Sequence, residues 1–97
     1  MALVVFTPAA ETDIADAVKW YERRATAVGV RFIAELDEAV GRVAANPMQY
    51  PVVYKNVRRA LLRRFPYALF FRIREDVIQV LGCFHTSRSP RRWQVRT

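Results

Sequence analysis

A chain of 97 residues, 53% hydrophobic and carrying both charge signs, has the size and composition of one globular domain over residues 1–97, which excludes a disordered protein. Its longest apolar runs, such as Ala2–Phe6 and Ala68–Phe71, are too short to cross a bilayer. The start carries no secretory signal, so we expect a cytoplasmic protein without membrane contact. The single cysteine, Cys83, excludes an internal disulfide and a zinc site built from thiolates.

The basic residues are concentrated in the second half of the chain. Residues 1–49 contain five Lys/Arg and seven Asp/Glu, a net charge of −2, whereas residues 50–97 contain 11 and two, a net charge of +9. Fourteen of the 16 basic residues are arginines, whose planar guanidinium suits phosphate and carboxylate groups. This distribution predicts an anionic partner, either nucleic acid or an acidic protein, although a solvated basic face would show the same pattern.

Two amphipathic helices follow a short apolar strand at Ala2–Phe6. Thr7-Pro8 has the residue types that begin a helix, with threonine as the N-cap and proline in the first turn, and apolar residues then recur at helical spacing. Turn residues around Ala25–Gly29 separate this helix from a second one, predicted over Val30–Ala45 and ended by Asn46-Pro47. The short connection predicts an antiparallel helical hairpin with an apolar stripe on each helix to bury.

After a loop at Pro47–Pro51, alternating patterns predict three strands. They cover Val57–Phe65, Ala68–Arg74 and Val77–His85, and a two-residue turn at Glu75-Asp76 joins the last two. The elements together predict an α+β fold of order β-α-α-β-β-β. It has an N-terminal strand and an antiparallel helical hairpin packed on one face of an antiparallel sheet.

The two-residue turn also determines which residues face each other across the last hairpin. It pairs Arg74 with Val77, Ile73 with Ile78, Arg72 with Gln79 and Phe71 with Val80. Because side chains alternate between the faces of a strand, one face forms a core beneath the helices, made of Tyr67, Leu69, Phe71, Ile73, Ile78, Val80 and Phe84. The other face is predicted to be open and basic, with Arg72, Arg74, Gln79 and His85 among Ala68, Phe70, Leu81 and Cys83.

The only histidine, His85, lies at the end of the last predicted strand, three residues before Arg88. Surrounding arginines favour the neutral imidazole, which suits a general base, although a histidine without a role fits the sequence equally well. One histidine and one cysteine do not supply a set of metal ligands, so we expect no metal and no cofactor.

Four arginines lie on the first of the three predicted strands. Alternation places one pair, either Arg58 and Arg64 or Arg59 and Arg63, on the open face beside Arg72. Such a cluster could hold phosphates or stabilise a phosphorane, or it could serve only as an electrostatic docking surface. The aromatic rings expected nearby, from Phe70 and Trp93, could stack on bases.

Specific motifs extend over nearly the whole chain. Trp20-Tyr21 lies on the first predicted helix, and Asn46-Pro47 ends the second. The most specific part runs from Phe65-Pro66-Tyr67 to the pattern His-x-x-Arg-x-Pro-x-x-Trp between His85 and Trp93. By these motifs the chain resembles the RelE/ParE superfamily, the toxins of bacterial type II toxin–antitoxin systems that are often labelled plasmid stabilisation proteins.

The resemblance implies the same order of elements and a cognate acidic antitoxin, a disordered segment of which folds against the toxin. Members that resemble ParE arrest growth by poisoning DNA gyrase, with no catalytic step of their own. Members that resemble RelE cut messenger RNA on the ribosome, without metal, by attack of a 2′-hydroxyl on the adjacent phosphate. The ending from Val80-Leu81 to His85-x-x-Arg88 resembles the ParE side, and the lysine-rich constellation of RelE is absent.

The candidate site residues differ between these functions. An endoribonuclease would use His85 with Arg72 or Arg64, although no carboxylate is well placed to complete the group. Contacts with the target or the antitoxin would come from Arg58, Arg59, Arg63, Arg74, Gln79, Arg88, Arg91, Arg92 and Trp93. A basic binding module without toxic activity is the alternative from another class. The sequence leaves open the identity of the antitoxin, the oligomeric state and whether residues 87–97 are ordered without a partner.

Overall fold

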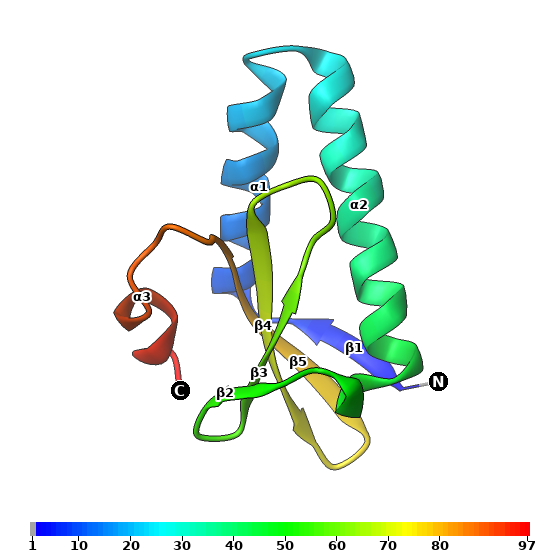
Figure 1. The fold of residues 1–97 in the computed structure, drawn as a ribbon, viewed down its shortest axis with the longest axis vertical. Helices are drawn as coiled ribbons and strands as arrows, with labels where there is room; N and C mark the ends of the chain where they lie inside the picture. Colours follow the sequence, from blue (N-terminus) through cyan, green and yellow to red (C-terminus); the bar gives the residue numbers. More distant parts are fainter. Residues whose placement is uncertain (1) are drawn as a thin grey trace.

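Two helices cover one face of a five-stranded sheet in the computed structural model, which describes residues 2–97 (Figure 1). The elements are β1 (Leu3–Phe6), α1 (Pro8–Glu22), α2 (Thr26–Ala45), the 3-10 helix η1 (Pro47–Gln49), β2 (Val52–Tyr54), β3 (Val57–Leu61), β4 (Tyr67–Arg74), β5 (Val77–His85) and α3 (Arg91–Gln94). The strand order is β1-β5-β4-β3-β2. The α+β prediction is confirmed, but the sheet is mixed rather than antiparallel, because β1 pairs in parallel with β5.

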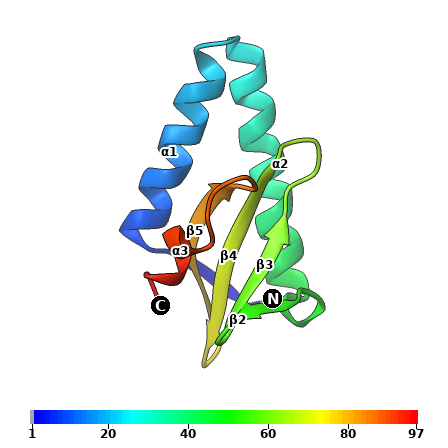
Figure 2. The ribbon, with the colours of Figure 1, turned by 60° about the vertical axis from the view of Figure 1, so that its left-hand side comes forward.

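The helical hairpin forms as predicted and extends past the end of the sheet (Figure 2). Thr7 is the N-cap of α1, and its Oγ1 accepts a hydrogen bond from the Ala10 N–H at 3.1 Å. The helix α2 starts at Thr26, four residues before the predicted start, since Gly29 belongs to the helix and not to the turn. A Cβ on Gly29 would lie 2.5 Å from Cγ of Glu22, so glycine allows the two helices to approach closely. No helix within residues 2–97 is long and apolar enough to span a membrane.

The region before β4 differs from the prediction. Strand β2 was not predicted, and it pairs with β3 across a tight turn in which Lys55 has a φ of 51°. Strand β3 ends at Leu61 instead of continuing to Phe65. Arg64 has a left-handed φ of 65°, which is incompatible with an extended strand, so the chain bends there before β4 begins.

The main core lies between the helical hairpin and the sheet. Its buried helical residues are Ala10, Ala17, Tyr21, Phe32, Leu36, Ala39 and Val43, and its buried sheet residues are Ala60, Leu69, Phe71, Ile78, Val80 and Cys83. Aromatic rings pack at the hairpin end of this core, where Tyr21 stacks on Phe32 with 5.2 Å between ring centroids. The neighbouring Trp20 is left 44% exposed.

The register of the β4–β5 hairpin is confirmed for its first four pairs, from Arg74 opposite Val77 to Phe71 opposite Val80. Glu75 takes a left-handed φ of 56° in the turn. Beyond these pairs a β-bulge intervenes, because Phe70 lies opposite Gly82 and an extra residue is inserted into β5.

The bulge reverses the alternation of the last residues of β5. Cys83 therefore packs in the main core beneath the helices, and Phe84 packs on the opposite face. His85 lies opposite Tyr67, with 5.3 Å between their ring centroids, on the side of the sheet that faces the helices. The predicted faces of these three residues are wrong, since strict alternation holds only in a strand without an inserted residue.

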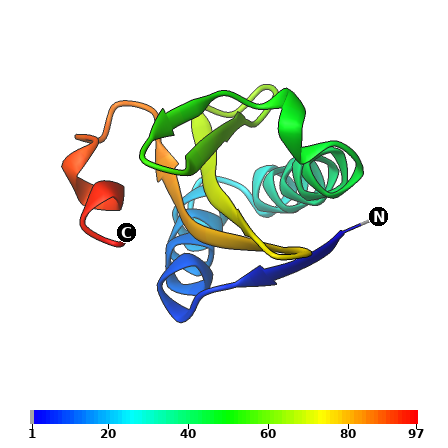
Figure 3. The same cartoon turned by 90° about the horizontal axis from the view of Figure 1, so that it is seen from below.

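The second face of the sheet had been predicted to be open, but part of its length is covered. A smaller buried cluster covers part of it, made of Val57, Ala68, Phe70, Leu81, Phe84 and Trp93. Trp93 comes from α3 and stacks on Phe70, with ring centroids 4.3 Å apart and an interplanar angle of 17°. The view from below shows α3 on the far side of β5 from α2 (Figure 3). We call this group the second core.

Candidate target-binding surface

The C-terminal segment, residues 86–97, folds back onto the second core. Its first residue, Thr86, donates its N–H to the Pro66 carbonyl at 2.8 Å. Trp93 is only 7% exposed, so its ring anchors the segment. The suggestion from the sequence that this ring could stack on a base is wrong, because the ring is buried. The sequence left open whether residues 87–97 are ordered without a partner, and in the structure they fold back onto the domain through the buried Trp93 ring.

Arg96 joins this segment to α1 and to the bulge of β5. Its guanidinium forms a bidentate pair with the Asp13 carboxylate, in which Nη2 donates to Oδ1 at 3.1 Å. Nη1 also donates to the Leu81 carbonyl at 3.0 Å, and the guanidinium lies over the Phe84 ring. Asp13 Oδ2 accepts the Cys83 N–H at 3.1 Å, so one carboxylate connects three parts of the chain.

Sequence reasoning did not identify Asp13 or Arg96 as site residues. A signal was present, because Asp13 lies three residues after Ala10 and four before Ala17, both of which are buried on α1. This spacing places a carboxylate on the buried stripe of the helix, where it requires a partner.

The orientation of His85 is determined by a local hydrogen bond. Its Nδ1 accepts the Ser87 N–H at 3.0 Å, and the Ser87 hydroxyl lies 2.8 Å from the same nitrogen. Because a backbone N–H can only donate, the neutral ring carries its proton on Nε2. His85 is thus arranged as a hydrogen-bond donor toward a ligand, whereas a general base would need a free lone pair.

Two cavities meet at His85. The larger, about 560 Å³, is a groove between α1, the end of β5 and the C-terminal segment, which we call the α1 groove. Its charged and aromatic lining is mainly basic, with two carboxylates at α1: Asp13, Asp16, Lys19, Trp20, Arg23, Tyr67, Phe84, His85, Arg88, Arg92 and Arg96. The smaller, about 110 Å³, lies beneath the segment, with Arg59, His85, Thr86 and Arg88 around the second core. Burial raises the pKa of the Tyr67 hydroxyl beside the α1 groove.

Neither predicted pair of arginines around β3 lies together on the second face of the sheet. Arg58 lies opposite Phe71, on the helix side, and donates to the Tyr50 carbonyl at 2.6 Å. Arg59 lies opposite Phe70, on the side of α3. Both pairings assumed a longer strand, which the structure does not have.

Arg63 and Arg64 line a separate cavity of about 340 Å³ beside α2, together with Arg31, Glu35, Glu38 and Phe65. Arg64 forms a salt bridge there with Glu35 at 3.8 Å. These arginines therefore lie away from the cavities that meet at His85.

The structure does not bring together the three candidate catalytic residues. Arg72 donates to the side chain of Gln79 at 2.9 Å and lies next to Arg74, near the β4–β5 turn. It is five residues along β4 from Tyr67, the partner of His85, a separation of about 17 Å at the usual rise of a strand. Arg64 lines the cavity beside α2 instead.

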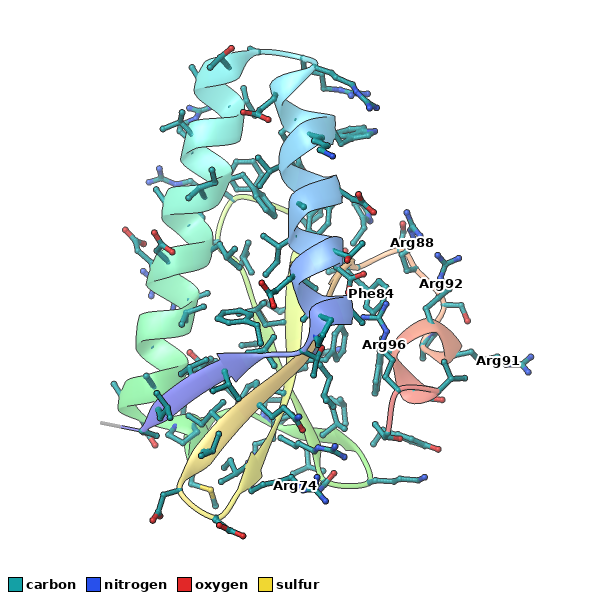
Figure 4. The ribbon with its side chains drawn as sticks, turned by 180° about the vertical axis from the view of Figure 1, so that it is seen from behind. Arg74, Phe84, Arg88, Arg91, Arg92 and Arg96 are labelled. Carbon is teal, nitrogen blue, oxygen red and sulfur yellow. The ribbon has the colours of Figure 1, made fainter. Side chains whose placement is uncertain are left out.

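Three arginines of the C-terminal segment project away from the body of the protein. Figure 4 shows Arg88, Arg91 and Arg92 pointing outward, while Arg96 turns inward beside Phe84. Within residues 2–97, the arginines that form salt bridges are Arg42, Arg64 and Arg96, so the three outward guanidiniums have no carboxylate within 4.0 Å. We call Arg88, Arg91 and Arg92 the outward arginines.

Residues 4–90 match the family model described as the ParE toxin of the type II toxin–antitoxin system parDE. The chain belongs to the ParE toxin family. The fold is also similar to a solved structure titled as the chromosomal ParDE toxin–antitoxin system from P. aeruginosa. The TM-score is 0.77 and the identity 21%, over 88% of this chain and 96% of that one. A comparison with curated proteins gave no match. The family match ends at residue 90, so α3 and Arg96 of this ParE-family chain lie outside it.

Proposed function

We propose that this ParE-family toxin arrests growth by binding DNA gyrase in the cytoplasm, and that the outward arginines contact the target. The observation that carries the proposal is their arrangement. Three guanidiniums without carboxylate partners project from a segment that the buried Trp93 holds in place. Because the backbone that carries these arginines is already fixed, binding an anionic surface does not require ordering the segment, which favours recognition.

Binding is supported over RNA cleavage by the geometry of the candidate catalytic group. His85, Arg72 and Arg64 lie in three different places, and the Nδ1 lone pair of His85 is already engaged by Ser87. A reaction by 2′-hydroxyl attack needs a base and a phosphate ligand within hydrogen-bond reach of one substrate. This geometry favours binding, and ribosome-dependent cleavage of messenger RNA is the alternative that the experiment below tests.

Neutralisation by an acidic antitoxin forms the second part of the proposal. The α1 groove offers Lys19, Arg23 and Arg88 beside the half-exposed ring of Trp20. A disordered segment with acidic and apolar side chains would find both complementary charge and an apolar contact there.

The test is expression without an antitoxin, with two readouts from the same cells. The proposal expects growth arrest with gyrase-dependent DNA breaks and intact messenger RNA. The triple variant Arg88→Ala, Arg91→Ala, Arg92→Ala should lose the arrest. A matched control, Arg31→Ala, Arg63→Ala, Arg64→Ala, removes the same charge beside α2 and should keep it.

Cut messenger RNA without DNA breaks would instead establish the ribonuclease alternative. No arrest at all would leave a basic binding module. Equal loss of arrest in both triple variants would mean that total charge, and not the position of the outward arginines, decides the activity.

A further inference from the structure

Three residues from distant parts of the sequence converge at the bulge of β5. Asp13 comes from α1, Gly82 from the bulge and Arg96 from the end of the C-terminal segment. The Asp13 carboxylate accepts from Arg96 and from the backbone of Cys83, and Arg96 also donates to the backbone of Leu81. The side chains of Asp13 and Arg96 are 13% and 25% exposed, so solvent screens the pair less than it would a surface pair.

Glycine at position 82 makes this convergence possible. A Cβ there would lie 2.8 Å from Nη1 of Arg96 and 3.2 Å from Oδ2 of Asp13. Both distances are shorter than ordinary van der Waals contact, so any other residue would displace the guanidinium. The ion pair beside the bulge thus depends on the space that glycine leaves at position 82.

The contacts that hold the C-terminal segment to the domain are few. From Arg92 to Thr97, every backbone N–H donates to a carbonyl between Ser89 and Gln94, within the segment itself. Ser87 and Arg88 also hydrogen-bond to His85 at the end of β5. Beyond Arg88, the attachment rests on the Trp93 ring and on the hydrogen bonds of Arg96. A four-residue helix is too short to hold its own shape in water. Loss of either attachment should therefore release it.

We propose that Asp13, Gly82 and Arg96 form a clamp that fixes the C-terminal segment and displays the outward arginines in the arrangement that the target recognises. Asp13 and Arg96 are positioning residues, since they act through the segment and do not touch the target. The functional half of this inference rests on the proposed function. The structural half, that the clamp holds Trp93 in the second core, stands independently of any target.

The structural half can be measured by tryptophan fluorescence. The chain has two tryptophans, so in a Trp20→Phe background the emission reports Trp93 alone. Asp13→Asn keeps the size of the side chain but removes the charge that pairs with Arg96. We expect its emission to shift to longer wavelength, as a ring released into water does. Asp16→Asn, which removes an exposed acidic charge one turn further along α1, should leave the emission unchanged.

Limited proteolysis separates release of the segment from a general loss of stability. Trypsin should cut after Arg88, Arg91 and Arg92 about 10- to 100-fold faster in Asp13→Asn, because cleavage follows the population of the open form and a charged hydrogen-bonded pair is lost. Cleavage after Arg23, at the end of α1, and after Arg31 on α2 should not change. Arg96→Lys keeps the charge but not the bidentate geometry, so it should behave as Asp13→Asn does.

Each outcome bears on one half of the inference. Unchanged Trp93 emission in Asp13→Asn, or equal acceleration of cleavage across the whole chain, would overturn the clamp. Wild-type behaviour of Arg96→Lys would show that net charge suffices and would also overturn it. If the segment is released but growth arrest persists, the positioning role is wrong while the proposed function stands. If the unmodified chain causes no arrest, the proposed function fails while the fluorescence result keeps its meaning.

Discussion

Replacing Trp93 by alanine tests whether the second core is a structural element of this domain. The ring is 7% exposed, stacks on Phe70 and contacts Tyr54 edge-on. Its removal would expose Phe70 and Phe84 to water, and Arg96 would become the main remaining link to the C-terminal segment. We therefore expect the variant to be less stable, although Trp93 lies four residues from the end of the sequence.

The magnitude follows from the buried area. A large aromatic ring removes about 150–250 Å² from water, and about 150 Å² of this lies beyond the alanine side chain. At about 25 cal/mol per Å², the loss is about 4 kcal/mol. Release of the segment returns conformational freedom to its residues, which offsets part of the loss. We expect the free energy of unfolding to fall by about 2–4 kcal/mol.

Urea denaturation followed by circular dichroism measures this free energy directly. Trp20→Ala is the matched control, because Trp20 is 44% exposed and its clearest contact is the Arg24 guanidinium, 3.3 Å from the ring centroid. It should cost about 1 kcal/mol or less. A Trp93→Ala variant within about 0.5 kcal/mol of the unmodified chain, the range of ordinary surface substitutions, would refute the second core.

Two further predictions concern the hydrogen bond of Arg58 and the buried thiol of Cys83. Arg58→Met should lower the free energy of unfolding by about 1.5–3 kcal/mol, because it removes the charged donor to the Tyr50 carbonyl, whereas Arg59→Met should change it little; thermal unfolding distinguishes them. Burial, and then the charge of Asp13, raise the pKa of Cys83 to about 12 from about 9. Above pH 9 the unfolded chain releases a proton that the folded thiol keeps. The free energy of unfolding is therefore unaffected by this group below pH 9 and falls as pH rises from 9 to 12. Cys83→Ala should reduce that fall in urea titrations, and equal slopes would contradict it.

The fold could be predicted from the sequence where a local pattern determined the geometry. Thr7-Pro8 defines the start of α1, and the two-residue turn at Glu75-Asp76 sets the pairing from Arg74 to Phe71. The bulge could not be predicted in this way, because an inserted residue leaves the hydrophobic pattern almost unchanged. Phe84 and Cys83 are both apolar and both buried, so the hydrophobic pattern of the sequence is the same whichever face each residue occupies.

The candidate site was harder to predict because it depends on contacts across the chain. Asp13 and Arg96 are 83 residues apart in sequence and meet beside the bulge of β5. The side that His85 faces depends on the same bulge. Composition indicated a basic C-terminal half correctly, but only the packing shows which of its charges are available.

The availability of charge decides how the net +9 of residues 50–97 should be interpreted. Several of its arginines are already committed within the protein, to carbonyls, an amide or carboxylates: Arg58, Arg64, Arg72 and Arg96. The outward arginines have no such partners, and Arg59 lines the same small cavity as Arg88. A uniformly basic surface would attract any polyanion, with affinity set by total charge. Guanidiniums concentrated on one anchored segment instead favour a partner with matching geometry. That partner can be a patch on the target or a stretch of antitoxin, so the same arrangement would let the antitoxin inhibit by occupying the arginines that the target needs.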